Sequence, residues 1–278
     1  MVKFGCCLPG GPFTPPSASH SPESDVAQIV AKCRFLLDCG FDFTEYTAIG
    51  LANLSDEDFQ QLIAENQQES LGLLAVNSLF PSTYCLANPG DQWEDIITYM
   101  HKVIDRLDSL GIPYAVFGSG RARAIPETIS KEEGLKNLRK LMCTFADYAE
   151  PKGITLVIEP LRSQESNVYN LVSEVNQEVL LINRPGVQLL ADSFHMLSED
   201  SPAEIPEDCA NTLKHCHIAE GLERLLPGYF NTGDPEYNKR FASSLNRIGY
   251  CNGVSIESSH KDFIEEVPKA LAYLRSIF

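Results

Sequence analysis

Four short apolar runs in the second half of the chain end in, or contain, a side chain that could bind a metal ion or transfer a proton. LVI is followed by Glu159, QLLA by Asp192 and VSI by Glu257, while His217 lies within LKHCHI. A buried carboxylate is costly unless a partner neutralises it. Three carboxylates in one place also repel one another, and a divalent cation between them removes that repulsion. The four side chains therefore predict a metal site.

This ligand set indicates which cation to expect. Three carboxylate oxygens and one imidazole suit Mn²⁺, with Mg²⁺ or Co²⁺ as alternatives, better than a structural zinc site. His215 and His217 point to the same side if their strand is regular, because side chains alternate along a strand. We select His217 as the ligand because it is nearer the end of the run. His215 is then expected in a second layer of the interior.

The elements that position these side chains recur along the chain. A helix-like stretch, a glycine and a short apolar run follow one another repeatedly, and strands are expected to start near residues 3, 41, 72, 113, 154, 187, 213 and 253. Continuous apolar runs are typical of parallel strands buried on both faces. The pattern predicts an α/β protein, a single (β/α)8 TIM barrel that forms one domain over residues 1–278. An open doubly wound sheet is less favoured, since LPGG at 8–11 lacks the spacing of a dinucleotide-binding loop.

Helix ends are also predicted from local signals. Ser130 to Glu133 forms a capping box, Ser55 to Asp58 is a similar signature, and Ser21 before Pro22 suits an N-cap. Glycine just past a helix takes the left-handed conformation that closes the last turn. Glycines in such places stand at positions 40, 72, 111, 153, 186 and 253.

Several weaker candidates lie near predicted strand ends. Active sites of such barrels lie where strands end and the following loops begin. Glu45 could face the cavity or cap a helix, and Asn77 could reach a substrate or fix a loop. Arg121 and Arg123 could meet a phosphate or carboxylate, or form salt bridges within this acidic protein.

Composition narrows the function classes. The formal net charge of −16 argues against a nucleic-acid partner. The sequence has neither an apolar run of transmembrane length nor a signal-peptide pattern, which argues against a membrane partner. Its nine cysteines are scattered, so we interpret them as reduced residues of a cytoplasmic protein.

The motifs around the four predicted ligands resemble those of the xylose isomerase-like TIM-barrel superfamily, the sugar phosphate isomerase/epimerase group. The nearest pattern is that of D-tagatose and D-psicose 3-epimerases and hydroxypyruvate isomerase-like proteins. IEPLRSQESN resembles their I-E-P-L-N-x-x-E-[ST]-N, with Arg162 at the usual asparagine. DSFH resembles D-x-x-H, GSGRAR at 118–123 resembles a loop common in the group, and SIE matches the last strand. HIAEGLERLLPG resembles H-x-x-E-x-x-R followed by P-G, with one extra residue before Arg224.

The resemblance implies an enzyme that acts on a small carbohydrate. A metal held by Glu159, Asp192, His217 and Glu257 would bind neighbouring oxygens of an open-chain sugar or sugar phosphate. Glu159 and Glu257 would be the catalytic pair: one removes a proton beside the carbonyl and the other returns it to the opposite face, which gives an epimer. Return to the neighbouring carbon would give an aldose–ketose isomerisation. The substrate-binding residues implied are Glu165, His195 and Arg224.

Other functions remain open at this point. A lyase or dehydratase acting on a polyol ketone, a dehydroshikimate-like acid or an oxidised glycoside would use the same proton abstraction. A non-catalytic sugar-binding barrel would be favoured if the four-ligand set were broken, and it is intact. An endonuclease of the abasic-site type would need more histidine ligands and a basic surface, which six histidines and the net charge disfavour. The resemblance also implies a homodimer or homotetramer.

Overall fold

The computed structural model describes residues 1–230 and 232–278, and its strands start close to the predicted positions. The eight strands that it contains are β1 (Lys3–Cys7), β2 (Phe43–Thr47), β3 (Leu73–Asn77), β4 (Tyr114–Phe117), β5 (Thr155–Ile158), β6 (Val187–Asp192), β7 (Leu213–Ile218) and β8 (Gly253–Ile256).

One or two α-helices follow each strand. They are α1 (Asp25–Asp38), α2 (Ala48–Asn53), α3 (Asp56–Gln68), α4 (Trp93–Leu110), α5 (Gly120–Arg123), α6 (Lys131–Ala149), α7 (Val172–Ile182), α8 (Ser193–Ser198), α9 (Tyr237–Arg247) and α10 (Phe263–Ile277). Short 3-10 turns span Gly90–Gln92, Glu150–Lys152 and Glu207–Cys209.

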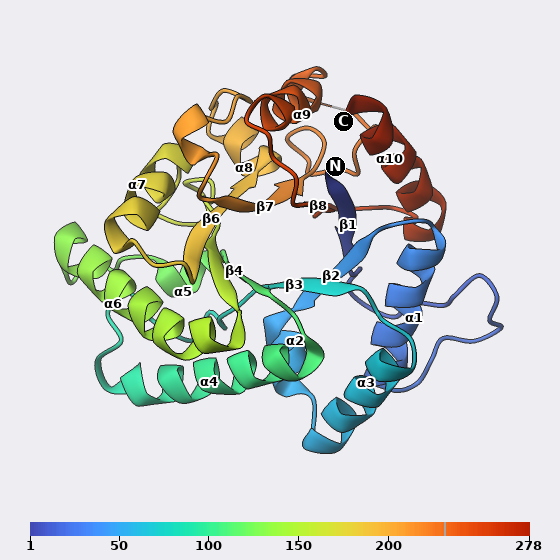
Figure 1. Cartoon of the computed structure of the whole chain (residues 1–278), viewed down its shortest axis with the longest axis horizontal. Helices are drawn as coiled ribbons and strands as arrows, with labels where there is room; N and C mark the ends of the chain where they lie inside the picture. The colour runs from blue at the N-terminus through green and yellow to red at the C-terminus, as the bar shows by residue number, and fades with distance from the viewer. Residues whose placement is uncertain (231) are drawn as a thin grey trace.

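The strands form a closed parallel barrel in sequence order, so the predicted (β/α)8 fold is confirmed. Figure 1 shows the strands around the centre and the longer helices outside them. β8 pairs with β1 as well as with β7, and this pairing closes the ring. At the closure the ring of Phe278 contacts that of Phe4, with centroids 5.3 Å apart.

Two of the three predicted N-cap residues, Ser55 and Ser130, cap their helices. The side chain of Ser130 accepts a hydrogen bond from the backbone N–H of Glu133 and begins α6, and Ser55 does the same for α3. Gly111 ends α4 in the left-handed conformation, with φ of 70°.

Three local predictions were wrong. Ser24, not Ser21, caps α1, because the Ser21 hydroxyl donates to the carbonyl of Phe13 in the preceding loop instead. At the end of α7 the left-handed residue is Asn183 and not the glycine at 186. After α9 it is the glycine at 249 and not the one at 253, which begins β8.

The strands bury side chains on both sides. The large core lies between the barrel and its helices and includes Cys216, which faces outward from β7. A smaller, separate cluster of Val116, Val157 and Leu190 lies inside the barrel. Because side chains alternate, the residues two positions beyond Val157 and Leu190 point to the same interior, one layer nearer the carboxyl ends of the strands. Those residues are Glu159 and Asp192.

Two further observations concern the chain as a whole. All nine cysteines are free thiols, as predicted. Within residues 1–230 and 232–278, no helix has both the length and the apolar composition needed to span a bilayer.

Candidate active site

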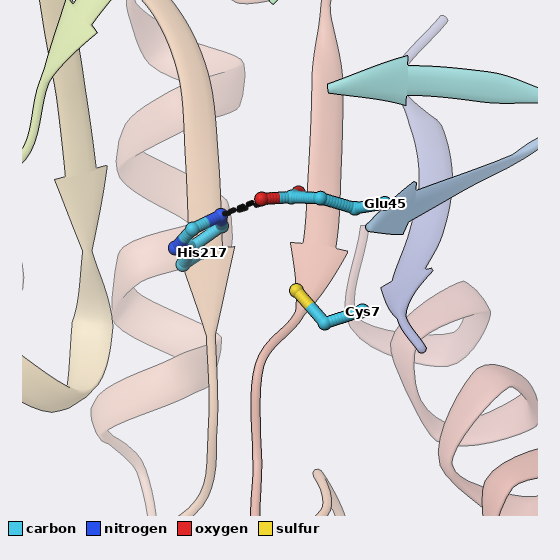
Figure 2. Close-up of side chains that lie close together, drawn as sticks. All are labelled: Cys7, Glu45 and His217. Atoms are coloured by element: carbon cyan, nitrogen blue, oxygen red, sulfur yellow. Dashed lines mark hydrogen bonds and ion pairs between the residues drawn. The ribbon is translucent and has the colours of Figure 1, made fainter. Parts of the chain in front are cut away.

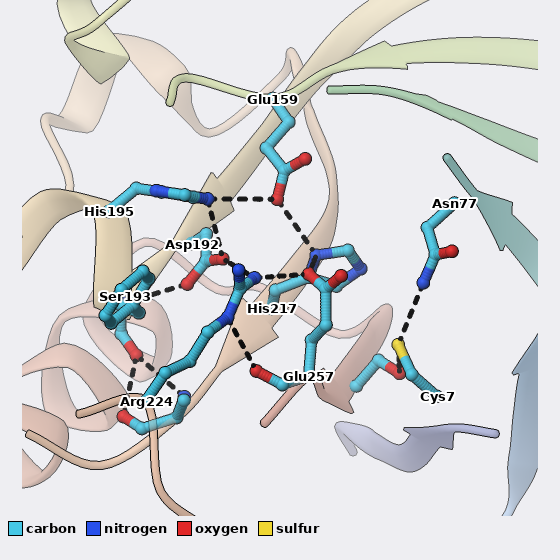
Figure 3. Close-up of polar contacts among 12 residues, drawn as sticks. Cys7, Asn77, Glu159, Asp192, Ser193, His195, His217, Arg224 and Glu257 are labelled. Carbon is cyan, nitrogen blue, oxygen red and sulfur yellow. Dashed lines mark hydrogen bonds and ion pairs between the residues drawn. The ribbon is translucent and has the colours of Figure 1, made fainter. Parts of the chain in front are cut away.

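The four predicted metal ligands lie together at the carboxyl end of the barrel. Glu159 follows β5, Asp192 is the last residue of β6, His217 lies near the end of β7, and Glu257 follows β8. Strand register aligns them, because Asp192 pairs with His217 and His217 pairs with Ser255. Figure 3 shows their side chains turned toward one another.

Their donor atoms are close enough to share one ion. One ligand atom from each of Glu159, Asp192, His217 and Glu257 can be chosen so that all four lie within 4.8 Å of one another. The first three residues are buried and Glu257 is partly exposed. Three carboxylate oxygens and one imidazole nitrogen at this spacing are a donor set that fits a divalent cation.

The imidazole of His217 contacts both predicted catalytic carboxylates through one nitrogen. Its Nδ1 lies 3.1 Å from Oε1 of Glu159 and 2.8 Å from Oε2 of Glu257. Burial raises the pKa of Glu159, and the hydrogen bond with His217 offsets part of that rise. Burial acts in the same direction on Glu257, but Arg224 and His217 outweigh it and lower the pKa of Glu257 to about 2. Two neighbouring carboxylates whose pKa values move in opposite directions are typical of an acid–base pair.

Arg224 lies at this cluster despite the extra residue before it. Its Nη2 donates to Oδ2 of Asp192 at 3.1 Å and to Oε2 of Glu257 at 2.6 Å, and its Nε donates to the carbonyl of Glu257 at 3.0 Å. Gly221 and Arg224 both have a positive φ, of 65° and 56°. These left-handed residues fold the longer loop back, so that the guanidinium reaches the cluster.

A cavity of about 590 Å³ opens above the cluster. Its size suits a small-molecule site. Polar groups dominate the side chains that line it, which include Asn77, Ser78, Ser82, Ser119, Gln164, Glu165, His195 and Arg224, together with Glu159 and Glu257.

The other two predicted substrate-binding residues lie on the wall of this cavity. His195 is buried; its Nδ1 accepts from the backbone N–H of Arg162 at 3.2 Å, and its Nε2 lies 3.6 Å from Oδ2 of Asp192. Glu165 is farther from the cluster, and its carboxylate accepts from Nε of Arg162 at 2.7 Å. Arg162, which stands where the motif has asparagine, thus orients both His195 and Glu165.

The GSGRAR loop forms another part of the wall. A Cβ on Gly118 would lie 2.3 Å from Oε2 of Glu159, so this glycine leaves the space that the carboxylate occupies. Arg123 is wholly buried and donates to the carbonyls of Phe117 and Tyr169, which gives it a structural role. Arg121 is exposed and lines the cavity. The structure therefore distinguishes the roles of Arg121 and Arg123, which the sequence alone did not.

Glu45 was misplaced by both interpretations of the sequence. It neither lines the cavity nor caps a helix, but lies inside the barrel beneath the cluster with no exposed surface. Its carboxylate contacts Nε2 of His215 and Nε2 of His217. Burial would raise the pKa of Glu45, but these two histidines hold it well below its ordinary value. The signal that could have found it is alternation, which places Phe43 and Glu45 on the same side of β2.

Cys7 lies beside Glu45 and was not predicted as a site residue (Figure 2). Cys7, Glu45 and His217 form a second group whose possible ligand atoms all lie within 4.8 Å of one another. Burial raises the pKa of the Cys7 thiol well above its ordinary value, which disfavours the thiolate that a metal would need. The thiol instead accepts a hydrogen bond from Asn77 at 3.3 Å.

Comparison with known proteins places this geometry in context. The model of the xylose isomerase-like TIM barrel family matches residues 33–277. A ketose 3-epimerase of Arthrobacter globiformis is 25% identical over 246 residues, which cover 86% of this chain and 79% of that protein. An L-ribulose 3-epimerase of Methylomonas sp. (strain DH-1) is 24% identical over 81% of this chain and 77% of its own.

Solved structures agree in fold. A D-allulose 3-epimerase from Methylomonas sp. superposes with a TM-score of 0.80 at 20% identity, covering 100% of this chain and 98% of that one. The 3-keto-D-glucoside 4-epimerase of E. coli superposes with a TM-score of 0.76 at 20% identity, covering 99% and 100%. The barrel, the rim cluster and the family match lead to one conclusion: the chain belongs to the xylose isomerase-like TIM-barrel family.

Proposed function

We propose that the chain is a divalent-cation-dependent epimerase or isomerase of a sugar or sugar phosphate. The observation that carries this proposal is the pair of carboxylates, Glu159 and Glu257, which both contact Nδ1 of His217 at the floor of a polar cavity. The relatives support it, since two are named ketose 3-epimerase and L-ribulose 3-epimerase and another is an inosose isomerase of Bacillus subtilis, 25% identical over 59% of this chain.

The cofactor in this proposal is one divalent cation, most simply Mn²⁺. Glu159, Asp192, His217 and Glu257 would hold it, because their donor atoms lie together at one end of the barrel. The bound cation supplies Lewis acidity, which makes a C–H beside a substrate carbonyl easier to deprotonate.

The two glutamates move the proton. They come from β5 and β8, which are separated around the barrel by β6 and β7, so they approach the cavity from different sides. One carboxylate removes the proton from one face of the substrate carbon, and the other returns a proton to the opposite face.

The remaining polar residues orient the substrate. His195, Glu165 and Arg224 line the cavity near the cluster and can bind hydroxyl or carbonyl oxygens. The polar lining suits a small carbohydrate. We keep as predictions that the protein is a single domain, that it works in the cytoplasm, and that it assembles as a homodimer or homotetramer.

Proton exchange tests this function. The protein is stripped of metal, reconstituted with Mn²⁺ and incubated in D₂O with free and phosphorylated ketoses and polyol ketones, while NMR follows deuterium and product. We expect exchange that depends on the cation, with an epimer or an aldose as product. Exchange followed by loss of water or of a glycosidic leaving group would instead show a lyase. If the protein bound no divalent cation, the proposal would fail.

Arg224→Lys tests the substrate-binding role of the guanidinium. Lysine keeps the positive charge near Asp192 and Glu257 but loses the planar fork that can also hydrogen-bond a substrate. A hydrogen bond to a charged group contributes about 1.5–3 kcal/mol, so we expect kcat/KM to fall about 10- to 100-fold, chiefly through KM. The matched control is Arg184→Lys, because Arg184 pairs with Asp147 and Glu150 on the surface. Equal KM values for wild type and Arg224→Lys would contradict the assignment.

A further inference from the structure

Glu45 has contacts that the proposed function does not use. Its Oε2 lies 3.0 Å from Nε2 of His215, and its Oε1 lies 3.1 Å from Nε2 of His217. All three side chains are completely buried, and Glu45 and His215 do not line the cavity. Figure 2 shows Glu45 extending from β2 across the barrel interior to the ring of His217. Glu45 therefore cannot touch a substrate and must act through its neighbours.

The chemistry of these contacts fixes the positions of two protons. An ionised carboxylate can accept hydrogen bonds but cannot donate them. Each ring nitrogen that faces Glu45 must therefore carry a proton, which makes Nε2 the protonated nitrogen of both histidines. The same rule places a proton on Nδ1 of His217 while no cation is bound; a bound cation would displace that proton and use the Nδ1 lone pair. Nδ1 is the atom that faces Glu159 and Glu257.

His215 holds the carboxylate in place from the other side. Its ring stacks on Tyr114 with centroids 6.0 Å apart and an interplanar angle of 20°. Its Nδ1 has no hydrogen-bond partner among the described residues, so the contact with Glu45 is its one polar tie there. A buried histidine with one polar contact is suited to anchoring a neighbour, and here that neighbour is Glu45.

We propose that Glu45 is a positioning residue for the metal site. It holds His217 in the tautomer protonated on Nε2 and turns the Nδ1 lone pair toward the cation held by Glu159, Asp192 and Glu257. This inference rests on the proposed function for its cation, and it assigns to β2 a role in a site whose ligands come from β5 to β8. Carboxylates that bind the outer nitrogen of a metal-bound histidine raise metal affinity in this way, and their loss costs about 10- to 100-fold.

The test is the affinity of the full-length protein for Mn²⁺ alone, measured by titration calorimetry without substrate. Glu45→Gln keeps the shape but places an amide N–H₂ against one of the imidazoles, so we expect the Kd to rise about 10- to 100-fold. The matched control is Glu178→Gln, which makes the same change at another buried glutamate, bonded to Arg139 outside the barrel. The control is expected to bind Mn²⁺ like the wild type. Saturating Mn²⁺ should restore most of the activity of Glu45→Gln, which loss of a catalytic group would not allow.

A second measurement reports on His217 directly. Nitrogen NMR of the Mg²⁺-loaded protein should show His217 protonated on Nε2, with its signals identified by their loss in His217→Asn. In Glu45→Gln we expect that tautomer to lose its dominance. If Glu45→Gln does not fold, Glu45→Asp replaces it. The Kd of Glu45→Asp for Mn²⁺ should rise above the wild-type value by less than the factor expected for Glu45→Gln.

The outcomes separate this inference from the proposed function. The inference is overturned if the folded Glu45→Gln protein, or Glu45→Asp in its place, has the wild-type Kd for Mn²⁺ and the wild-type His217 tautomer. This holds whatever the activity of the variant. A different result would contradict the proposed function and leave the inference standing. In that case the wild type binds Mn²⁺ and the variant binds it more weakly, but the wild type exchanges no proton with any ketose.

Discussion

Glu257→Gln is expected to lower the turnover of the epimerase or isomerase reaction by about 10²- to 10⁴-fold, the usual contribution of a positioned acid or base. Glutamine keeps an oxygen that can face the cation, but it cannot accept the substrate proton. Glu159→Gln should cost a similar factor if the proton is returned from the opposite face. Product formation by each variant is measured at saturating Mn²⁺, after metal content has been checked.

The pair of variants also separates two reaction types. An epimerase needs both carboxylates, so each replacement should stop the formation of product. An isomerase that moves the proton between carbons on one face needs a single base, and one of the two variants would then retain activity. Glu178→Gln again serves as the control, because Glu178 is buried in an ion pair away from the cavity. Full activity in both variants would remove the two glutamates from the mechanism.

Gly118→Ala is expected to reduce kcat/KM about 100-fold while the protein stays folded. The new methyl group would lie 2.3 Å from Oε2 of Glu159, so the carboxylate must move away from its present position. A displacement of about 1 Å at a reacting group can cost on the order of 10²-fold in rate. Steady-state kinetics and circular dichroism measure the two parts of this expectation.

The control for this substitution is Gly10→Ala. A Cβ on Gly10 would meet no atom within 4 Å among the described residues, and its φ is not in the left-handed region. We expect the control to keep wild-type kinetics. Wild-type kinetics in Gly118→Ala as well would show that Glu159 can work from a different position, which would weaken the proposed geometry.

The barrel and its four rim side chains were predictable because both follow from regular repetition. Strand starts were marked by a glycine or a turn before an apolar run, and parallel strands bring their carboxyl ends to one rim. Glu159, Asp192 and Glu257 each stand at such an end, so their convergence required no knowledge of side-chain packing. The expectation of a divalent cation then followed from the chemistry of oxygen donors.

The depth of Glu45 was not predictable from that repetition. Glu45 was predicted near a strand end, whereas β2 continues two residues further, to Thr47. Those two additional residues place Glu45 one layer below the rim, where it meets histidines from a strand 170 residues later. Contacts across a barrel depend on how far each strand extends, and a single sequence fixes strand ends poorly.

The location of Arg224 was uncertain for a different reason. Motif spacing counts residues, but the loop reaches the cluster through two left-handed conformations, at Gly221 and at Arg224 itself. Arginine is seldom found in that region, so the sequence offered no sign of it. Pairing of Glu220 with Leu225 then closes the loop around the additional residue.

The closure of the barrel between β8 and β1 makes the order of its elements cyclic. With Phe278 packed on Phe4, the two ends of the described chain meet at a seam that is hydrogen-bonded like the other seven. Each strand from β1 to β8 therefore has a hydrogen-bonded neighbour on both sides, and none of them offers an open edge to another chain. The turn around Gly153 precedes β5 at the amino end of the strands, opposite the rim, so an insertion there would leave the cavity untouched.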